Sequence, residues 1–319
     1  MSDPVANREV TGGGQTRGPG DLVWRLSVAA PAPLTRFAPA PTGYLHLGHV
    51  VNAVYVWGLA GALGGRVLLR IEDHDRQRAR RAYERALLDD LDWLGFAPDI
   101  HPTAAFRSGP CEGRQSDRDS VYRDALAPLI ACGRVYACDC TRQQVSSPVY
   151  SGRCRERGLP LGDGVGWRVR IDATAEVFDD GLLGPQRQVP ADQCGDVLVR
   201  DRLGNWTYQW AATTDDTRQG ITLVVRGQDL LDSTGRQIQL ARLLGREMPP
   251  LFVHHRLVMK TATQKLSKSD GDTGIRDLRA ARWTPETVIG HAAVLAGLAP
   301  GGLSIAAAAV PELFDGRRG

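Results

Sequence analysis

The sequence predicts an α/β protein built on a doubly wound parallel sheet, and two observations point to this class. Short apolar runs of the length of buried strands alternate with segments whose apolar residues recur at helical spacing. This alternation occurs early in the chain and resumes after residue 205, with a differently patterned segment between the two parts. The chain is therefore expected to form one sheet that is interrupted by an insertion.

The first part of the sheet is expected to be a βαβ unit. Leu34–Ala38 is an apolar strand, and the following Pro39–Gly43 favours a sharp loop before a helix that begins near Gly48. Val67–Ile71 is a continuous apolar run typical of a buried parallel strand. Arg81–Leu94 repeats apolar residues at helical spacing, so a second helix follows.

The second part of the sheet is expected to contain a strand over Thr222–Val225, a helix over Ser233–Leu244 and a further strand over Leu251–Val258. Arg276–Gly319 can supply one or two helices. The expected division is a flexible N-terminal extension over 1–33, a nucleotide-binding domain in two halves over 34–105 and 205–270, an inserted acceptor-facing subdomain over 106–204, and a short helical region over 271–319.

Composition bounds the class of protein. The 319 residues are 42% hydrophobic and 24% charged, as in folded soluble proteins. A net charge of +3 does not by itself predict nucleic-acid binding, although arginines gather at 76, 78, 80, 81 and 85, where a solvated helix face is the alternative. No apolar stretch is long enough to span a bilayer and no secretory signal is expected. We therefore expect a cytoplasmic monomer with no membrane partner.

All three lysines of the chain lie in one short segment. They are Lys260, Lys265 and Lys268, and every other member of the 39 lysines and arginines is an arginine. An ammonium is a compact, mobile point charge, whereas a guanidinium is planar and bidentate, so the two do not substitute for each other. Chance clustering is the alternative. A polar loop with two ammonium groups suits a phosphate chain whose charge changes during a reaction.

His46-Leu47-Gly48-His49, at the start of the first predicted helix, is a second candidate phosphate site. Unpaired backbone donors and the helix dipole favour an anion there, and both imidazoles can donate to phosphate oxygens. Gly48 has no Cβ and so allows a base or ribose to approach closely. A structural role for the two histidines is an equal alternative when they are considered alone. Together with the lysine segment they predict a nucleotide held between opposite ends of a sheet.

These two motifs resemble the HIGH and KMSKS signatures of class I aminoacyl-tRNA synthetases. Arg36–Gly43, Arg70–Asp73 and Val225–Leu231 further resemble the glutamyl branch of that class. The resemblance implies a Rossmann-like catalytic domain and a ligase that uses ATP, with Mg²⁺ bridging the phosphates. The implied ATP-binding residues are His46, Gly48, His49, Lys265 and Lys268. His46, His49 and Lys268 are the implied catalytic residues, with Lys268 neutralising developing charge.

The implied amino acid is L-glutamate, which offers two carboxylates and one ammonium. Two arginines and one acid match these groups, and Arg36, Arg226 and Glu72 supply them. Tyr208 matches the family's substrate-contacting tyrosine. Ala40 stands where the family commonly has serine, so one hydrogen bond to the substrate is expected to be absent or supplied by water. For each arginine alone, a surface ion pair is the alternative.

Cys138, Cys140, Tyr150 and Cys154 place three thiols and a phenol in one short segment. Such a set can close around zinc, and the pattern resembles the zinc site of glutamyl-Q tRNA(Asp) synthetases, shortened relatives of glutamyl-tRNA synthetase. The implied zinc is structural, because four protein ligands leave no open position for water. Reduced buried thiols without a metal are the alternative.

The resemblance implies ATP-dependent formation of glutamyl adenylate and transfer of glutamate to queuosine in the anticodon loop of tRNA(Asp). Residues 271–319 are too few for an anticodon-binding domain, so none is expected. One alternative is a glutamyl-tRNA synthetase that charges the 3′ end of tRNA(Glu). Two others are a ligase that acts on a small metabolite and a non-catalytic RNA-binding relative.

Overall fold

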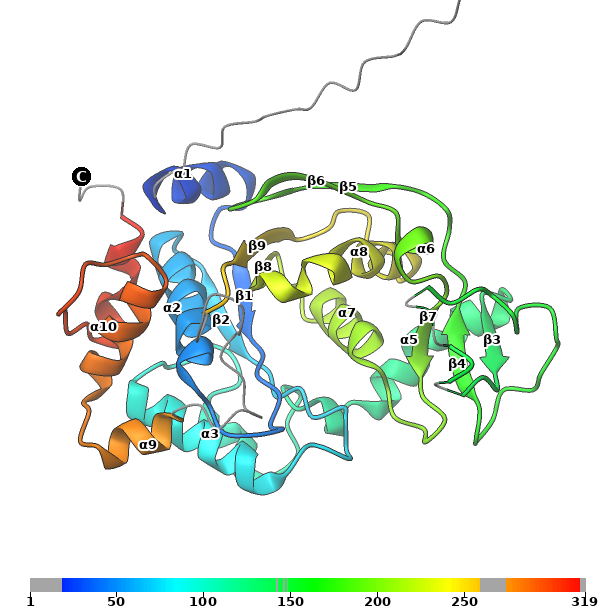
Figure 1. Cartoon of the computed structure of the whole chain (residues 1–319), viewed down its shortest axis with the longest axis horizontal. Helices are drawn as coiled ribbons and strands as arrows, with labels where there is room; N and C mark the ends of the chain where they lie inside the picture. The colour runs from blue at the N-terminus through cyan, green and yellow to red at the C-terminus, as the bar shows by residue number, and fades with distance from the viewer. Residues whose placement is uncertain (1–18, 142, 146, 148, 259–273, 316–319) are drawn as a thin grey trace, which may run out of the picture.

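The structure is a computed structural model that describes residues 19–141, 143–145, 147, 149–258 and 274–315. Its central element is the predicted βαβ unit, formed by β1 (Leu34–Phe37), α2 (Leu47–Ala62) and β2 (Arg66–Leu69) (Figure 1). β1 and β2 are parallel, as predicted. The helix α3 (Arg81–Leu94) follows and ends at Gly95, whose φ of 80° is in the left-handed region that glycine tolerates.

The second part of the sheet also contains the predicted elements. The helix α7 (Tyr208–Arg218) precedes β8 (Leu223–Gly227), and the 3-10 helix η2 (Gln228–Ser233) leads into α8 (Thr234–Leu243) and β9 (Leu251–His255). β8 and β9 pair in parallel. A backbone hydrogen bond of 2.9 Å from Thr222 N to Leu34 O joins the start of β8 to β1. The motifs at residues 36 and 226 are therefore brought onto neighbouring strands.

Both faces of these strands are covered. Val67, Leu69 and Val225 belong to a core with α2, α3 and the C-terminal helices, whereas the intervening Leu68 and Val224 belong to a core with α8. The alternation follows from the two-residue period of a strand. Helical cover on both faces is the doubly wound arrangement that the sequence predicts.

The segment over 106–204 contains most of the remaining elements. They are α5 (Asp119–Ala131), β3 (Val135–Cys138), β4 (Gly166–Val169), β5 (Glu176–Asp180), β6 (Gly184–Gln188), α6 (Pro190–Gln193) and β7 (Val197–Arg200), preceded by α4 (Thr103–Ser108) and the 3-10 helix η1 (Gln115–Asp117). β3, β4 and β7 form a small antiparallel sheet of their own.

The hairpin β5–β6 differs from the prediction of a purely parallel nucleotide-binding sheet. β5 pairs in parallel with β9 at Asp180 and Phe252, so that the larger sheet has the order β6-β5-β9-β8 with an antiparallel edge. A parallel partner strand so distant in sequence leaves no local signal, because pairing is decided by tertiary contacts. The main sheet is therefore mixed.

The prediction of a flexible extension is wrong for residues 19–29. These residues form the helix α1 (Pro19–Ala29), whose Leu22 and Leu26 are buried in the main core. The side chain of Arg25, which the sequence presents as an interruption of an apolar stretch, donates from Nη2 to Gly181 O at 2.7 Å. The buried residues of α1 are Leu22 and Leu26, one turn apart. Two apolar positions are too few to show a clear helical period in the sequence.

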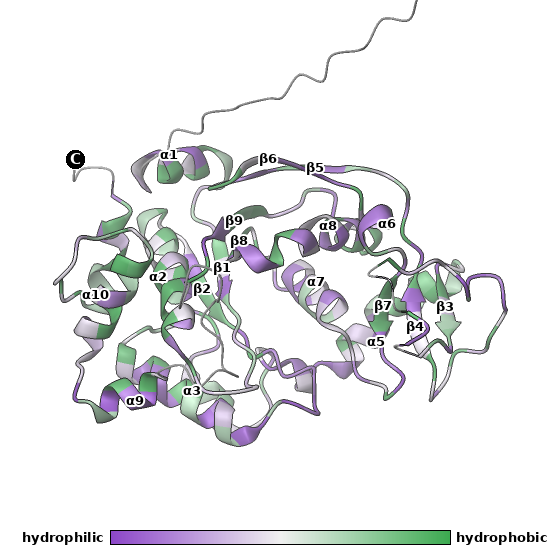
Figure 2. Ribbon diagram, in the orientation of Figure 1, coloured by the Kyte–Doolittle hydropathy of each residue, from purple (hydrophilic) through white to green (hydrophobic). Residues whose placement is uncertain are grey.

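The C-terminal part forms α9 (Ile275–Ala280), α10 (Pro285–Leu295) and the 3-10 helix η4 (Ala307–Leu313). Figure 2 shows extensive hydrophobic colour on α2 and α10, which pack together. Gly58 of α2 lets the ring of Phe314 approach so closely that a Cβ there would lie 2.1 Å from the ring. Among the described residues, no helix combines the length and apolar character that a membrane span requires.

Candidate active site

A buried network of opposite charges lies where β1, β2 and α7 meet. Arg36 on β1 donates from Nε to Asp216 Oδ1 at 3.2 Å, and Arg70 donates from Nη1 to the same oxygen at 2.8 Å. Arg70 also donates from Nη2 to Glu72 Oε1 at 3.3 Å. Burial would lower the pKa of Arg70, but Asp216, Glu72 and Asp215 raise it well above its ordinary value. Asp216 thus connects Arg36 to Glu72 through Arg70.

Glu72 sits at the edge of this network as a buried carboxyl. Burial raises its pKa, and the nearby Arg70 opposes that rise. Its backbone N donates to Pro39 O at 3.1 Å, which ties the end of β2 to the loop after β1. A buried carboxyl beside a substrate pocket can pair with an ammonium group, because the pairing offsets the cost of its burial.

Arg226 on β8 is held by neutral side chains. Its guanidinium donates from Nε to His254 Nε2 at 2.9 Å, from Nη1 to Gln237 Oε1 at 2.6 Å and from Nη2 to Thr234 Oγ1 at 2.7 Å. In the described part of the chain, Arg226 forms no salt bridge with a carboxylate. Its side chain is buried, and burial lowers its pKa. A buried guanidinium with neutral partners attracts an anionic ligand.

His254 and Asp180 continue the support behind Arg226. His254 Nδ1 lies 2.6 Å from Asp180 Oδ2, and both side chains are almost completely buried. Burial lowers the pKa of His254, so the ring is neutral. With Nε2 accepting from Arg226, the hydrogen is assigned to Nδ1, which donates to Asp180. Asp180 belongs to β5, so the unexpected strand orients a predicted substrate-binding arginine.

The other two predicted glutamate contacts lie beside these groups. Tyr208, the first residue of α7, accepts at its hydroxyl from Arg226 Nη1 at 3.5 Å. Ala40 lies in the loop that follows β1, and its carbonyl accepts from Thr42 N at 2.9 Å. Arg36 lies close enough to Arg226 for its positive charge, together with burial, to lower the pKa of Arg226. Two guanidinium groups that repel each other across one site suit a ligand with carboxylate groups.

His46, Gly48 and His49 shape the start of α2. His46 is the N-cap, and its Nδ1 accepts from Gly48 N at 3.1 Å, while His49 Nδ1 accepts from His46 N at 3.1 Å. Because both Nδ1 atoms accept these backbone hydrogen bonds, a ring hydrogen is assigned to each Nε2. Gly48 has a steric role, because a Cβ there would lie 2.9 Å from the His46 ring. The two histidines therefore cap the helix.

Lys260, Lys265 and Lys268 lie outside the described residues. The described chain stops at Val258, shortly after β9, and resumes at Gly274. The backbone of Gly274 forms a bridge with His46, and Ile275 N donates to Leu45 O at 2.9 Å. Gly274, six residues after Lys268, is thus anchored beside the predicted phosphate site.

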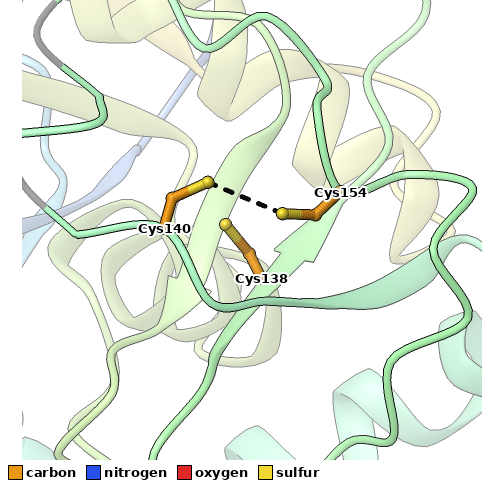
Figure 3. Close-up of side chains that lie close together, drawn as sticks. All are labelled: Cys138, Cys140 and Cys154. Carbon is orange, nitrogen blue, oxygen red and sulfur yellow. Dashed lines mark hydrogen bonds between the residues drawn. The ribbon is translucent and has the colours of Figure 1, made fainter.

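The three cysteines predicted as metal ligands come together (Figure 3). The sulfur atoms of Cys138, Cys140 and Cys154 all lie within 4.8 Å of one another, and those of Cys140 and Cys154 are 3.5 Å apart. Cys138 Sγ is 3.4 Å from the hydroxyl of Tyr150. Sulfur atoms bound to one tetrahedral zinc at about 2.3 Å lie roughly 3.8 Å apart. The spacing and donor chemistry of this set therefore fit a zinc ion.

The electrostatics around the cysteines favour a thiolate at one position. Burial alone would raise the pKa of Cys138, but hydrogen bonds from Tyr150 and Arg168 lower it to about 7. Burial and the neighbouring thiols raise the pKa of Cys140 to about 11. Arg168 lies 3.7 Å from the centre of the Tyr150 ring and fixes its orientation. A first thiolate at Cys138 is thus available before a metal binds.

Several residues of the site have no signal in the sequence. Asp215 accepts from Arg118 Nε at 2.7 Å and from Tyr122 Oη at 2.9 Å, and Asp216 joins the two arginines described above. Both acids lie inside α7, where adjacent aspartates would ordinarily mark an exposed face. Asp180 and His254 are likewise ordinary strand residues in the sequence. Their roles appear only when distant segments pack together.

Comparison with known proteins identifies relatives over most of the chain. A family model described as tRNA synthetases class I (E and Q), catalytic domain, matches residues 34–150 and 162–305. A glutamyl-Q tRNA(Asp) synthetase of Symbiobacterium thermophilum is 42% identical over 283 residues, which are 82% of this chain and 86% of that protein. One from Rhodobacter capsulatus is 38% identical and covers 80% of this chain and 98% of its own length.

A solved structure supports the same family. The crystal structure of a glutamate–tRNA synthetase from Elizabethkingia anophelis superposes with a TM-score of 0.74 at 26% identity, and covers 89% of this chain. This chain spans 65% of that longer protein. The matched family model describes a catalytic domain, and the parallel strands with a charged site at their ends are consistent with such a domain. The chain therefore belongs to the class I tRNA synthetases of the E and Q family, whose catalytic domain it contains.

Proposed function

We propose that this protein activates L-glutamate with ATP and transfers it to queuosine in tRNA(Asp). The observation that carries the amino-acid assignment is Arg226, a buried guanidinium held in place by His254, Gln237 and Thr234, all neutral. Arg36 provides a second guanidinium, and Glu72 provides a carboxyl for the ammonium group. One carboxylate of glutamate binds Arg226 near Tyr208, and the other remains available for reaction.

Activation requires that the α-carboxylate of glutamate attack the α-phosphorus of ATP and displace pyrophosphate. Holding the reactants in line and neutralising charge supplies most of the acceleration in phosphoryl-type chemistry. In this proposal the start of α2, with His46 and His49, binds the triphosphate, and Gly48 admits the nucleoside. In this proposal Lys265 and Lys268, which lie outside the described residues, also bind the phosphates, and the bridge between Gly274 and His46 supports this role.

Metal ions have two separate roles in the proposal. Mg²⁺ would arrive with ATP and would neutralise charge on the phosphates, without a dedicated protein cage. Cys138, Cys140, Cys154 and Tyr150 would hold zinc, which would cross-link the insertion rather than supply chemistry. Because all four ligands come from the protein, no reaction step passes through this ion.

The acceptor in the proposal is a hydroxyl of the cyclopentene ring of queuosine, which attacks the carbonyl carbon of glutamyl adenylate and releases AMP. The glutamyl-Q tRNA(Asp) synthetases that match most of this chain support that acceptor. The second candidate acceptor is the 3′-terminal ribose of tRNA(Glu), which the similarity to a glutamate–tRNA synthetase favours.

Two assays test the proposal. Exchange of labelled pyrophosphate into ATP is measured with free glutamate in the absence of RNA, with glutamine and aspartate as controls. We expect exchange with glutamate alone, and its absence would overturn the assignment of amino acid. Labelled glutamate is then offered with tRNA(Asp) that contains or lacks queuosine, and with tRNA(Glu). Labelling of tRNA(Glu) instead of queuosine-containing tRNA(Asp) would establish the alternative acceptor.

A further inference from the structure

A cavity lined by several arginines lies beside residues of the amino-acid site. Its volume is about 920 Å³, and it is bounded by the N-terminal half of α3, α4 and the residues before α5. Pro41 and Asp73 line it, and each directly follows a predicted glutamate contact, Ala40 and Glu72. A ligand in this cavity is therefore next to the site of glutamate activation.

Two of the arginines of the cavity are already neutralised. Arg107 pairs with Asp89 at 2.8 Å, and Arg114 pairs with Glu84 at 2.6 Å and with Asp117 at 2.7 Å. These ion pairs join the helices that form the walls. Their charges are therefore largely balanced within the protein, which leaves little charge for a ligand.

Four further arginines of the cavity have no acidic partner in the described part of the chain. Among the described residues, the side chain of Arg76 donates only to Ser116 O at 3.3 Å, and the side chain of Arg80 donates only to the carbonyls of Gln77 and Ala79. The side chains of Arg81 and Arg85 form no hydrogen bond or salt bridge with any described residue. All four are exposed. Arg81 and Arg85 are one helical turn apart on α3, so their side chains share one face.

The wall of the same cavity is partly apolar. Leu88 and Phe106 are buried side chains that line it, and Pro110 is exposed at its edge. An apolar surface suits the flat face of a ribose or base, whereas unpaired guanidinium groups suit phosphate oxygens. A volume of about 920 Å³ is large enough for a nucleotide unit.

We propose that this arginine cavity, defined by Arg76, Arg80, Arg81 and Arg85, binds the phosphate backbone of the acceptor RNA next to the nucleotide that receives glutamate. The inference rests on the proposed function, because that function makes an RNA the second substrate. Phosphate contacts fix the register of a nucleic acid on a protein, so the cavity would present the reacting hydroxyl to glutamyl adenylate.

The test uses a variant that lowers the charge of the cavity without changing helix propensity. The double variant Arg81→Gln/Arg85→Gln replaces two exposed arginines of α3 by another good helix former. Arg187→Gln is the matched control, because Arg187 is also exposed and lies on β6, on the opposite side of the molecule from α3 in Figure 1. Thermal unfolding is measured to establish that all variants fold.

Two readings separate RNA binding from activation. We expect the double variant to keep the RNA-free exchange rate of the parent protein, while its KM for tRNA in glutamate transfer rises about tenfold at moderate salt. The slope of log binding constant against log salt for tRNA should fall by about one for each arginine that contacts a phosphate. Arg187→Gln should leave both quantities unchanged.

The failures of the two proposals are distinguishable. If the parent protein shows no exchange with glutamate, the proposed function fails. If exchange and transfer by the parent are normal but the double variant keeps the parent's KM and salt slope for tRNA, the arginine cavity is not an RNA site. Loss of RNA-free exchange in the double variant would also overturn the inference, because it would assign the arginines to the phosphates of ATP.

Discussion

Replacement of His254 by leucine tests whether the chain from Asp180 through His254 to Arg226 sets the affinity for glutamate. Leucine fills the space of the ring but offers neither nitrogen. Arg226 Nε then loses its 2.9 Å acceptor, and the guanidinium keeps only Gln237 and Thr234. The buried carboxylate of Asp180 loses the ring donor at 2.6 Å. The arginine is then free to tilt away from the orientation that receives a carboxylate.

The size of the effect follows from the kind of hydrogen bond that is lost. A hydrogen bond to a charged group contributes about 1.5–3 kcal/mol, and each 1.4 kcal/mol is about a factor of ten in binding. KM for glutamate in pyrophosphate exchange should therefore rise about 10- to 150-fold if the whole loss appears in substrate binding. The turnover number should change much less, because His254 forms its hydrogen bonds with Arg226, Thr234 and Asp180 and, among the described residues, with none of the predicted ATP-binding residues.

His255→Leu is the control for this experiment. His255 is also buried, but its Nε2 faces Asn52 Oδ1 at 3.1 Å and its ring stacks on Tyr55, away from Arg226. Both variants should lose thermal stability, but only His254→Leu should raise KM for glutamate. Asp180→Asn retains an oxygen that can accept from the ring and should have a smaller effect. Equal KM values in the two histidine variants would refute the reasoning.

Three further predictions concern the metal, the pH dependence and the lysine segment. The purified protein should contain one zinc ion per chain. Cys154→Ser should abolish zinc binding and lower the melting temperature, while pyrophosphate exchange persists. Full zinc content in this variant would contradict the proposed ligand set. Burial lowers the pKa of His254 and His255 below the ordinary value of about 6.5, so the unfolded chain binds more protons than the folded chain below that pH. Their contribution to stability is present above about pH 6.5 and is lost as pH falls below it, so denaturant unfolding of His255→Gln should show a weaker acid dependence than the parent. Lys268→Ala should reduce glutamate-dependent exchange by about two to three orders of magnitude, as loss of a preorganised charge does, and an unchanged rate would remove its catalytic role.

The sequence by itself determined the elements that carry the strongest local patterns. β1, α2, β2, α3, β8, α8 and β9 lie within a few residues of their predicted positions, because buried parallel strands and amphipathic helices leave clear periods in the chain. The spacing of Cys138, Cys140, Tyr150 and Cys154 also predicted a cluster, and their sulfur and oxygen atoms meet. These features depend on residues that are close together in the sequence.

Tertiary structure decided how the charged groups of the site are held. Arg70 is completely buried between Asp216 and Glu72. Arg226 is oriented by His254, and His254 is in turn hydrogen-bonded to Asp180 of β5. A single buried charge is unfavourable, so such side chains are tolerated only when distant segments supply partners, and no local period records that pairing. The helix α1 and the β5–β6 edge were unrecognised for the same reason: their stability comes from surfaces that form only when the rest of the chain has folded.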